Sequence, residues 1–139
     1  MALMTWSSKY SVGVKALDDQ HHAMMKILNK LHAASMLGKA REVADPLLDK
    51  LTSLANEHFS AEEMLMESVK FPGLAAHRAQ HREMAGKIAE ITVGHREGDA
   101  SVYVPFLYFM GDYQTKHMQT EDREYARWLA AHDVKQSNR

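Results

Sequence analysis

Residues 74–95, LAAHRAQHREMAGKIAEITVGH, are the stretch that decides the fold. Apolar and histidine side chains recur here at alternating steps of three and four residues: Leu74, His77, His81, Met84, Ile88, Ile91 and His95. Because an α-helix turns once every ~3.6 residues, these positions share one face of a helix. The pattern predicts a long amphipathic helix whose seam is buried in an antiparallel bundle.

Similar seams elsewhere predict three more helices with short connections between them. We expect an irregular N-terminal arm over residues 1–17, helices at about 18–37, 41–69, 73–95 and 101–131, and a polar tail over 133–139. Asp18 is the expected N-cap of the first helix, and Gly38 is its stop signal. This pattern predicts one all-α domain over residues 1–139, an up-down-up-down antiparallel four-helix bundle with an irregular N-terminal arm.

Composition excludes several classes of function. The formal charge of −1 offers no field for gathering nucleic acid, so no nucleic-acid partner is expected. The chain has no cysteine, which excludes disulfides, iron–sulfur clusters and thiolate catalysis. No apolar stretch approaches the ~18 residues of a membrane span, and the N-terminus does not resemble a signal peptide, so we expect a cytoplasmic protein.

Five histidines occupy seam positions, where an apolar side chain is usual: His21, His58, His77, His81 and His117. Glu62 follows His58 by four residues, and His81 follows His77 by four, so each pair projects from one helical face. A lone seam histidine is more often a hydrogen-bonded core residue than a ligand. A whole set of them with two carboxylates is different, because a buried carboxylate without a partner costs several kcal/mol. The set therefore indicates a metal site.

The second carboxylate, Asp122, is five residues after His117, which corresponds to about 140° around a regular helix. The apolar seam also shifts by one residue between His117 and Met118. A local π-type widening of the helix at this point would bring Asp122 to the same side as His117.

The kind and number of ligands indicate two iron ions. Seven converging ligands are too many for one zinc, which usually takes four. Imidazole and carboxylate ligands suit iron, and two carboxylates and an oxo or hydroxo group could bridge two ions. If both ions are six-coordinate, this set leaves one position open, on the ion with fewer histidines. A site with five neutral imidazoles and only two carboxylates disfavours high-valent iron, so reversible dioxygen binding is favoured over oxidative attack on substrates.

The chain resembles the hemerythrins, and especially the single-domain bacteriohemerythrins, over nearly its whole length. The resemblance rests on an ordered set of motifs: Trp6, Leu17-Asp18-Asp19-Gln20-His21, His58-Phe59-Ser60-Ala61-Glu62-Glu63, Phe71-Pro72 before His77-x-x-x-His81, and His117-Met118-x-x-x-Asp122. Single pieces such as His-x-x-x-His are weak signals, whereas the ordered set is specific. It implies a bundle of the kind found in myohemerythrin.

The resemblance also implies a role for each candidate ligand. His77, His81 and His117 would hold the saturated iron, and His21 and His58 would hold the iron with the open position. Glu62 and Asp122 would bridge the two ions together with the oxo or hydroxo group. The implied ligand is dioxygen, bound for carriage, storage or delivery, and an unknown protein that receives the oxygen is a possible partner.

The chain departs from the family pattern at one place near the expected oxygen pocket. Hemerythrins usually have Trp-Leu three to four residues before the histidine of the fourth helix, where this chain has Tyr113-Gln114. We expect the pocket lining to include Met24, Phe59, Gln114 and Met118. The polar Gln114 would either hydrogen-bond the bound species or admit water and speed oxidation to the diferric form, so Gln114→Leu tests its role through the autoxidation rate.

Other functions stay open at this stage. The alternatives are an oxygen or redox sensor and a di-iron enzyme that removes peroxide or nitric oxide, while iron storage is disfavoured by a site for only two ions. The remaining histidines are interpreted as surface or helix-end residues: His22, His32, His95 and His132. Glu63 is interpreted as solvated, with a hydrogen bond to a ligand histidine as the alternative.

Overall fold

The computed structural model describes residues 3–5 and 10–132, apart from the side chains of Gln114, Met118 and Gln119. Trp6 and the polar tail 133–139 lie outside the described residues. The helices are α1 (Lys15–Met36), α2 (Ala40–Ser68), α3 (Leu74–Arg96), the short 3₁₀ helix η2 (Ala100–Val102), α4 (Tyr103–Gln119) and α5 (Glu121–Ala131). None of the described helices is long and apolar enough to cross a membrane.

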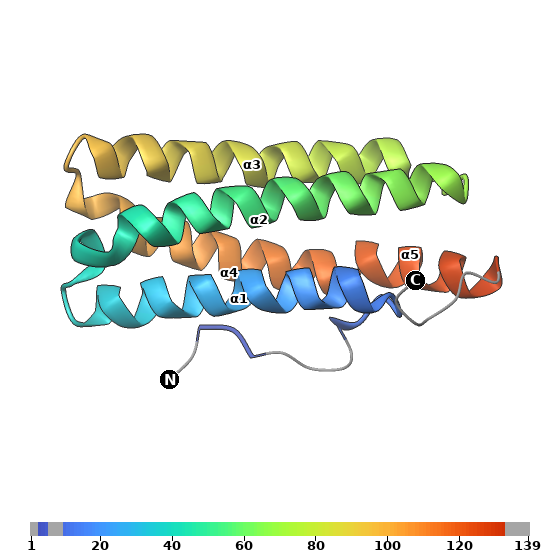
Figure 1. Ribbon diagram of the computed structural model, residues 1–139, viewed down its shortest axis with the longest axis horizontal. Coiled ribbons are helices and arrows are strands. Elements are labelled where there is room, and N and C mark those ends of the chain that lie inside the picture. The colour runs from blue at the N-terminus through green and yellow to red at the C-terminus, as the bar shows by residue number, and fades with distance from the viewer. Residues whose placement is uncertain (1–2, 6–9, 133–139) are drawn as a thin grey trace.

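The long helices pack side by side as an antiparallel bundle, which confirms the predicted all-α class and bundle topology. Figure 1 shows the axes of α1, α2 and α3 side by side as three rods, and α4 and α5 follow one another to form the fourth rod. Each rod contacts the rod that follows it in the chain, and α4 also contacts α1, so the four rods surround a common core. The seam side chains fill the interior, and Leu28, Leu31, Leu51 and Leu107 are fully buried there.

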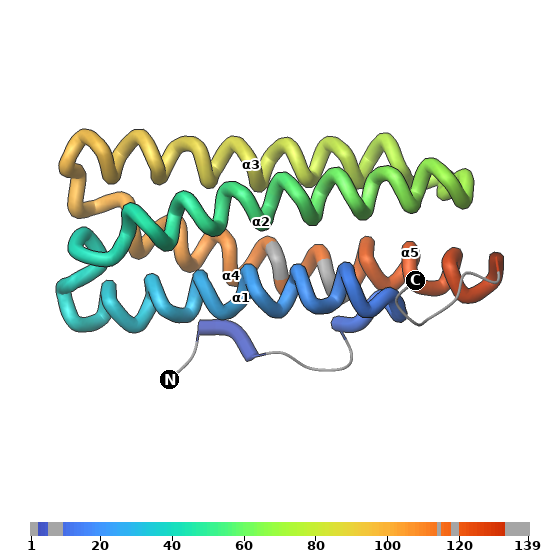
Figure 2. Tube along the Cα trace, viewed as in Figure 1, coloured from blue at the N-terminus to red at the C-terminus, as the bar shows by residue number. Residues whose placement is uncertain are grey.

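The fourth rod is divided, whereas the sequence predicts one continuous helix. The Cα trace in Figure 2 passes from α4 to α5 along a common direction. Thr120 separates the two helices, with φ −112° and ψ −73°. The Thr120 N–H still donates to the Lys116 carbonyl at 3.0 Å, and the Glu124 N–H donates to the Thr120 carbonyl at 3.1 Å. The chain therefore changes phase at Thr120 while keeping its direction.

The N-terminal arm is tied to α1 rather than only leading into it. The side-chain amide of Asn29 accepts from the Met4 N–H at 2.8 Å and donates to the Met4 carbonyl at 2.7 Å. Asp18 lies in the first turn of α1, which begins at Lys15, and does not cap it as the sequence predicts. Its carboxylate instead accepts from the Val12 N–H at 2.9 Å and from the Ser11 hydroxyl, because the arm folds back over this turn.

Candidate metal centre

Seven polar side chains from all four rods meet inside the bundle. His21 comes from α1, His58 and Glu62 from α2, His77 and His81 from α3, His117 from α4, and Asp122 from α5. Each of these residues is at most 3% exposed. A buried group of this charge is too costly to keep unless its members are paired or bind a cation.

Three imidazoles lie around two carboxylate oxygens, one from Glu62 and one from Asp122. The Nε2 atoms of His77 and His81 both lie 3.0 Å from Glu62 Oε1. Asp122 Oδ1 lies 3.0 Å from His77 Nε2 and 3.1 Å from His117 Nε2. One side of the centre thus gathers three imidazole nitrogens and two carboxylate oxygens.

The other oxygen of each carboxylate faces the remaining two imidazoles. Glu62 Oε2 lies 3.5 Å from His58 Nε2, and Asp122 Oδ2 lies 3.6 Å from His21 Nε2. The two carboxylates therefore stand between a group of three histidines and a group of two. This arrangement is what two ions sharing both carboxylates would require.

The separations between donor atoms suit six-coordinate ions. Neighbouring ligands around an octahedral ion with bonds of about 2.1 Å are about 3.0 Å apart, since the separation is √2 times the bond length. The separations on the three-histidine side are close to this value. Ligand atoms of Glu62, His77, His81 and His117 lie within 4.8 Å of one another, as do those of His21, His58 and Glu62.

Unpaired atoms show that the centre is built for a cation. Among the described residues, His58 Nε2, His117 Nε2, Glu62 Oε2 and both Asp122 oxygens are buried without a hydrogen-bond partner. Buried polar groups are almost always paired, so such a concentration of unpaired atoms needs an explanation. Every one of them is a lone-pair donor of a type that binds iron. The residues therefore fit a pair of metal ions.

Three of the imidazoles are held from behind by a side-chain oxygen. His58 Nδ1 donates to Gln20 Oε1 at 2.9 Å, and His117 Nδ1 donates to Gln80 Oε1 at 2.7 Å. His81 Nδ1 donates to Glu63 Oε2 at 2.7 Å. A proton on Nδ1 leaves the Nε2 lone pair free toward the centre, as metal-binding histidines require. Sequence reasoning missed Gln20 and Gln80, because both lie on a different helix from the histidine they contact.

The electrostatics of the centre keep both carboxylates ionised. Burial alone would raise the pKa of Glu62, but His58, His77 and His81 together hold this pKa well below its usual range. Burial and Glu62 likewise oppose the ionisation of Asp122, yet His117 and His77 lower its pKa to about 2. Burial, with the neighbouring His21, lowers the pKa of His58 to about 3, so this imidazole is neutral. Burial would lower the pKa of His77, but the Asp122 and Glu62 carboxylates raise it to about 9, so a cation that binds at His77 displaces a proton.

Asp122 faces inward, but not through the π-type widening that the sequence predicts. The described residues contain no π-helical turn, and the phase change instead occurs at the Thr120 break. Starting a new helix at Glu121 places Asp122 in its first turn, next to His117 across the break. The one-residue shift in the seam correctly indicated that the helix is irregular at this point, but the predicted π-type geometry was wrong.

Comparison with known proteins gives the same result as this geometry. Residues 12–129 match the family model described as the hemerythrin HHE cation-binding domain. The chain belongs to the hemerythrin family. Its buried cluster is accordingly a His/Glu/Asp metal-binding cluster of the hemerythrin type.

Individual hemerythrins resemble the chain over nearly its full length. A bacteriohemerythrin of Methylococcus capsulatus is 32% identical over 132 residues, which cover 94% of this chain and all of that protein. A bacteriohemerythrin of Stenotrophomonas maltophilia is 27% identical, covering 95% of this chain and 85% of the relative. The crystal structure of a wild-type hemerythrin has 31% identity and a TM-score of 0.83, covering 93% of this chain and 99% of that one.

A small cavity lies against the metal cluster. Its volume is about 10 Å³, which is about the room that one water needs. The lining residues that the structure describes are all buried: His21, Met24, Ala55, His58, Phe59, His81, Met84, Ile88, Met110 and His117. Met24 and Phe59 were expected here, while the side chains of Gln114 and Met118 lie outside the described residues. Sequence reasoning missed Met84 and Met110, although both occupy seam positions within two turns of a histidine.

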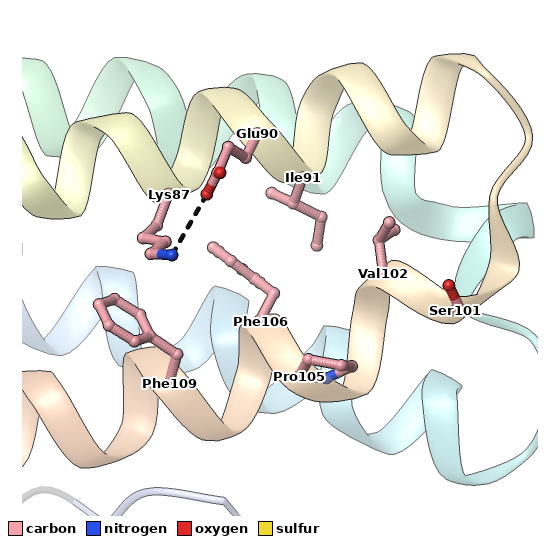
Figure 3. A pocket seen from close by; sticks show the side chains of 8 residues that line it. All are labelled: Lys87, Glu90, Ile91, Ser101, Val102, Pro105, Phe106 and Phe109. Atoms are coloured by element: carbon pink, nitrogen blue, oxygen red, sulfur yellow. Dashed lines mark ion pairs between the residues drawn. The ribbon is translucent and has the colours of Figure 1, made fainter.

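A larger cavity between α3 and α4 has no comparable chemistry. Its volume is about 370 Å³, and Figure 3 shows Lys87 and Glu90 pointing toward one another across its edge. The Lys87 Nζ lies 3.4 Å from Glu90 and 5.1 Å from the centre of the Phe109 ring. The Ser101 hydroxyl donates to Asp99 Oδ1 at 2.6 Å. Since these polar groups already have partners, we assign this cavity no ligand.

The sequence indicates that His95 is a surface or helix-end residue; it does lie in the last turn of α3, but it is buried. Its Nδ1 lies 2.5 Å from the Tyr103 hydroxyl, and its Nε2 lies 2.7 Å from Asp45 Oδ1. The turn through η2 returns the chain over the end of α3 and brings Tyr103 onto His95. His95 is thus a hydrogen-bonded core residue outside the metal cluster.

Proposed function

We propose that this hemerythrin-family chain binds dioxygen reversibly at a di-iron centre, for carriage, storage or delivery of oxygen. In this assignment His77, His81 and His117 hold one iron, and His21 and His58 hold the other. Glu62 and Asp122 would be shared between the two ions, together with an oxo or hydroxo group. A pair of ferrous ions in this site would supply the two electrons on which dioxygen binding depends.

The small cavity is the observation that supports dioxygen most directly. It touches His21 and His58, the pair that would hold the ion with the open position, and also His81 and His117. Its volume of about 10 Å³ is about the room that one water needs, so the cavity has no room for an organic substrate. A site of this size favours binding of a small gas over an enzyme that oxidises organic molecules.

Apolar side chains form part of the wall around the cavity and limit the access of water to the metal cluster. Phe59 lies flat against His81, with ring centres 4.3 Å apart and planes inclined by 15°. Met24, Ile88 and Met110 supply the rest of an apolar wall. An apolar wall disfavours charged products such as superoxide, and it also limits the water that would help to displace them. Retention of dioxygen is therefore the expected consequence.

Anaerobic loading with ferrous iron tests the proposal. We expect two irons per chain, a visible absorption band on exposure to oxygen, and loss of the band when oxygen is removed. His77→Ala should reduce the bound iron, because this imidazole contacts both carboxylates. His132→Ala is the matched control, since His132 is exposed and contacts Trp128 rather than any residue of the metal cluster described above.

Other outcomes of this experiment would contradict the proposal and favour a different function. Failure to take up paired ions would exclude a di-iron function. Uptake followed by irreversible oxidation, with steady consumption of added peroxide or nitric oxide, would favour a detoxifying enzyme. Peroxide and nitric oxide are small molecules like dioxygen, so the size of the cavity does not distinguish these functions and reversibility is the property that decides.

A further inference from the structure

Three methionine side chains from three different helices line the small cavity. Met24 comes from α1, Met84 from α3 and Met110 from α4. Each is 3% exposed, so solvent does not reach the thioethers from outside. They share the cavity with four imidazoles of the metal cluster and with the apolar side chains of Ala55, Phe59 and Ile88.

The thioether is the most readily oxidised group in this lining. Hydrogen peroxide converts methionine to methionine sulfoxide, which reductases reverse. In that step the peroxide O–O bond breaks, one oxygen forms the S–O bond, and the other leaves as water. The sulfur loses the two electrons that the peroxide gains.

We propose that Met24, Met84 and Met110 form an oxygen-atom acceptor site, which captures hydrogen peroxide produced inside the cavity. The proposal rests on the proposed function, because the peroxide arises when dioxygen takes two electrons from the ferrous pair and two protons from water. A molecule in a cavity of about 10 Å³ lies in contact with its walls, so peroxide formed there meets these sulfurs before it reaches solvent.

The chain contains its own controls for this proposal. Met25 and Met66 are at most 1% exposed and do not line the cavity, so they report on burial alone. Met36 and Met64 are 69% and 72% exposed and report on peroxide in the solvent. Oxidation from within and oxidation from outside should therefore mark different methionines.

Site-resolved mass spectrometry of the iron-loaded protein tests the proposal. The diferrous protein is taken through repeated cycles of oxygen exposure and reduction, with catalase present to remove peroxide from the solvent. Tandem spectra then give the sulfoxide fraction at each methionine. We expect several-fold more sulfoxide at Met24, Met84 and Met110 than at Met25 and Met66. Metal-free protein treated with hydrogen peroxide should show the reverse order, with Met36 and Met64 oxidised first.

Replacing the acceptors gives a second measurement. The variant with Met24→Leu, Met84→Leu and Met110→Leu keeps the volume and apolar character of the wall, so it is expected to fold. It should release several-fold more hydrogen peroxide into solution per iron oxidised than the parent does. The variant with Met25→Leu and Met66→Leu is the matched control and should release as much as the parent.

The failure of this proposal is distinguishable from failure of the proposed function. If iron is taken up and oxidised by dioxygen, but the cavity methionines gain no more sulfoxide than Met25 and Met66, the acceptor site is overturned alone. Unchanged peroxide release in the triple variant would have the same meaning. If no iron pair forms, or dioxygen does not oxidise it, the proposed function itself fails.

Discussion

At the scale of single residues, the metal cluster depends on side chains that never face its centre. Gln20, Glu63 and Gln80 each accept a hydrogen bond from the outer nitrogen of a candidate ligand imidazole. Such contacts fix the ring orientation and the tautomer, and both determine how well the inner nitrogen binds a metal. Two of the three acceptors are neutral amides, whereas Glu63 carries a charge that Arg78 Nε compensates at 3.2 Å.

Gln80→Leu is expected to weaken iron binding by about tenfold or more, because His117 loses its hydrogen-bond acceptor. The measurement is competition between the protein and a ferrous chelator under anaerobic conditions. Glu90→Gln, on the exposed part of the same helix, should leave the affinity unchanged. Equal affinities for all three proteins would show that Gln80 does not position His117.

The sequence was informative about the histidines that face the centre of the cluster. It was much less informative about the side chains that accept hydrogen bonds from them. The positions of His77 and His81 follow from helical periodicity, because four residues bring two side chains to one face. The contact between Gln80 and His117 depends instead on how α3 and α4 are aligned along their axes. A single sequence contains no periodic signal for that alignment, so Gln80 could not be assigned.

At the scale of elements, α1, α2 and α3 end in the same way. In each, a residue with positive φ follows the C-cap, and the next N–H returns to a carbonyl five residues earlier: Gly38 with Lys39, Lys70 with Phe71, and Gly98 with Asp99. This is the Schellman motif, in which glycine is preferred because it has no Cβ. Lys70, with φ 54°, is the exception.

Lys70→Gly is expected to stabilise the fold by about 1 kcal/mol, because it removes the cost of a side chain in the left-handed region. Gly38→Ala is the opposite change at the equivalent position, where φ is 70° and a Cβ would meet nothing within 4 Å. It should therefore destabilise the fold by a similar amount through backbone conformation alone. Urea unfolding of the metal-free proteins measures both changes, and effects of the same sign would contradict this account.

Helix ends were predictable where the sequence carries glycine, and less so elsewhere. Gly38 marked its turn correctly, whereas nothing about Lys70 indicates a left-handed conformation. The break at Thr120 is a similar case, since threonine is not a specific helix terminator. Only the shifted phase of the apolar seam indicated that the fourth rod is irregular there.

At the scale of the whole molecule, metal binding and folding are expected to be coupled. The cluster joins all four rods, and the unfolded chain offers no such site, so bound iron stabilises only the folded state. Ions present at ~1,000 times their dissociation constant contribute about 4 kcal/mol each, or about 8 kcal/mol for the pair, which at about 3 °C per kcal/mol should raise the Tm by roughly 25 °C. Calorimetry of the metal-free and iron-loaded protein measures this, and equal Tm values would exclude the coupling.

The protein should also lose stability at alkaline pH. Burial raises the pKa of Tyr103, raises that of Tyr113 to about 12, and raises that of Tyr125 with help from Glu62 and Asp122. The folded state therefore keeps these phenols neutral, while the unfolded chain ionises them near pH ~10. Stability is fully present below pH ~10 and falls as the pH rises toward the folded pKa values.

Phenolate absorbance and urea unfolding from about pH 9 to about pH 11 check this expectation. The free energy of unfolding should decline across the range, and the absorbance of the folded protein should lag behind that of the protein in urea. Complete ionisation of the tyrosines near pH ~10 in a protein that is still folded would contradict it.

The break at Thr120 has a consequence for the order in which the site is assembled. Helices α1 to α4 bring six of the seven side chains together, and Asp122 alone arrives on the short α5. Metal capture is therefore expected to finish with the docking of α5, whose Trp128 indole donates to the Val69 carbonyl at 2.9 Å. Amide hydrogens of Glu121–Ala131 should exchange with deuterium faster in the metal-free protein than in the loaded one, while those at the centres of α1 to α3 change much less. Uniform protection along the chain would mean that the last ligand is already in place before any ion enters.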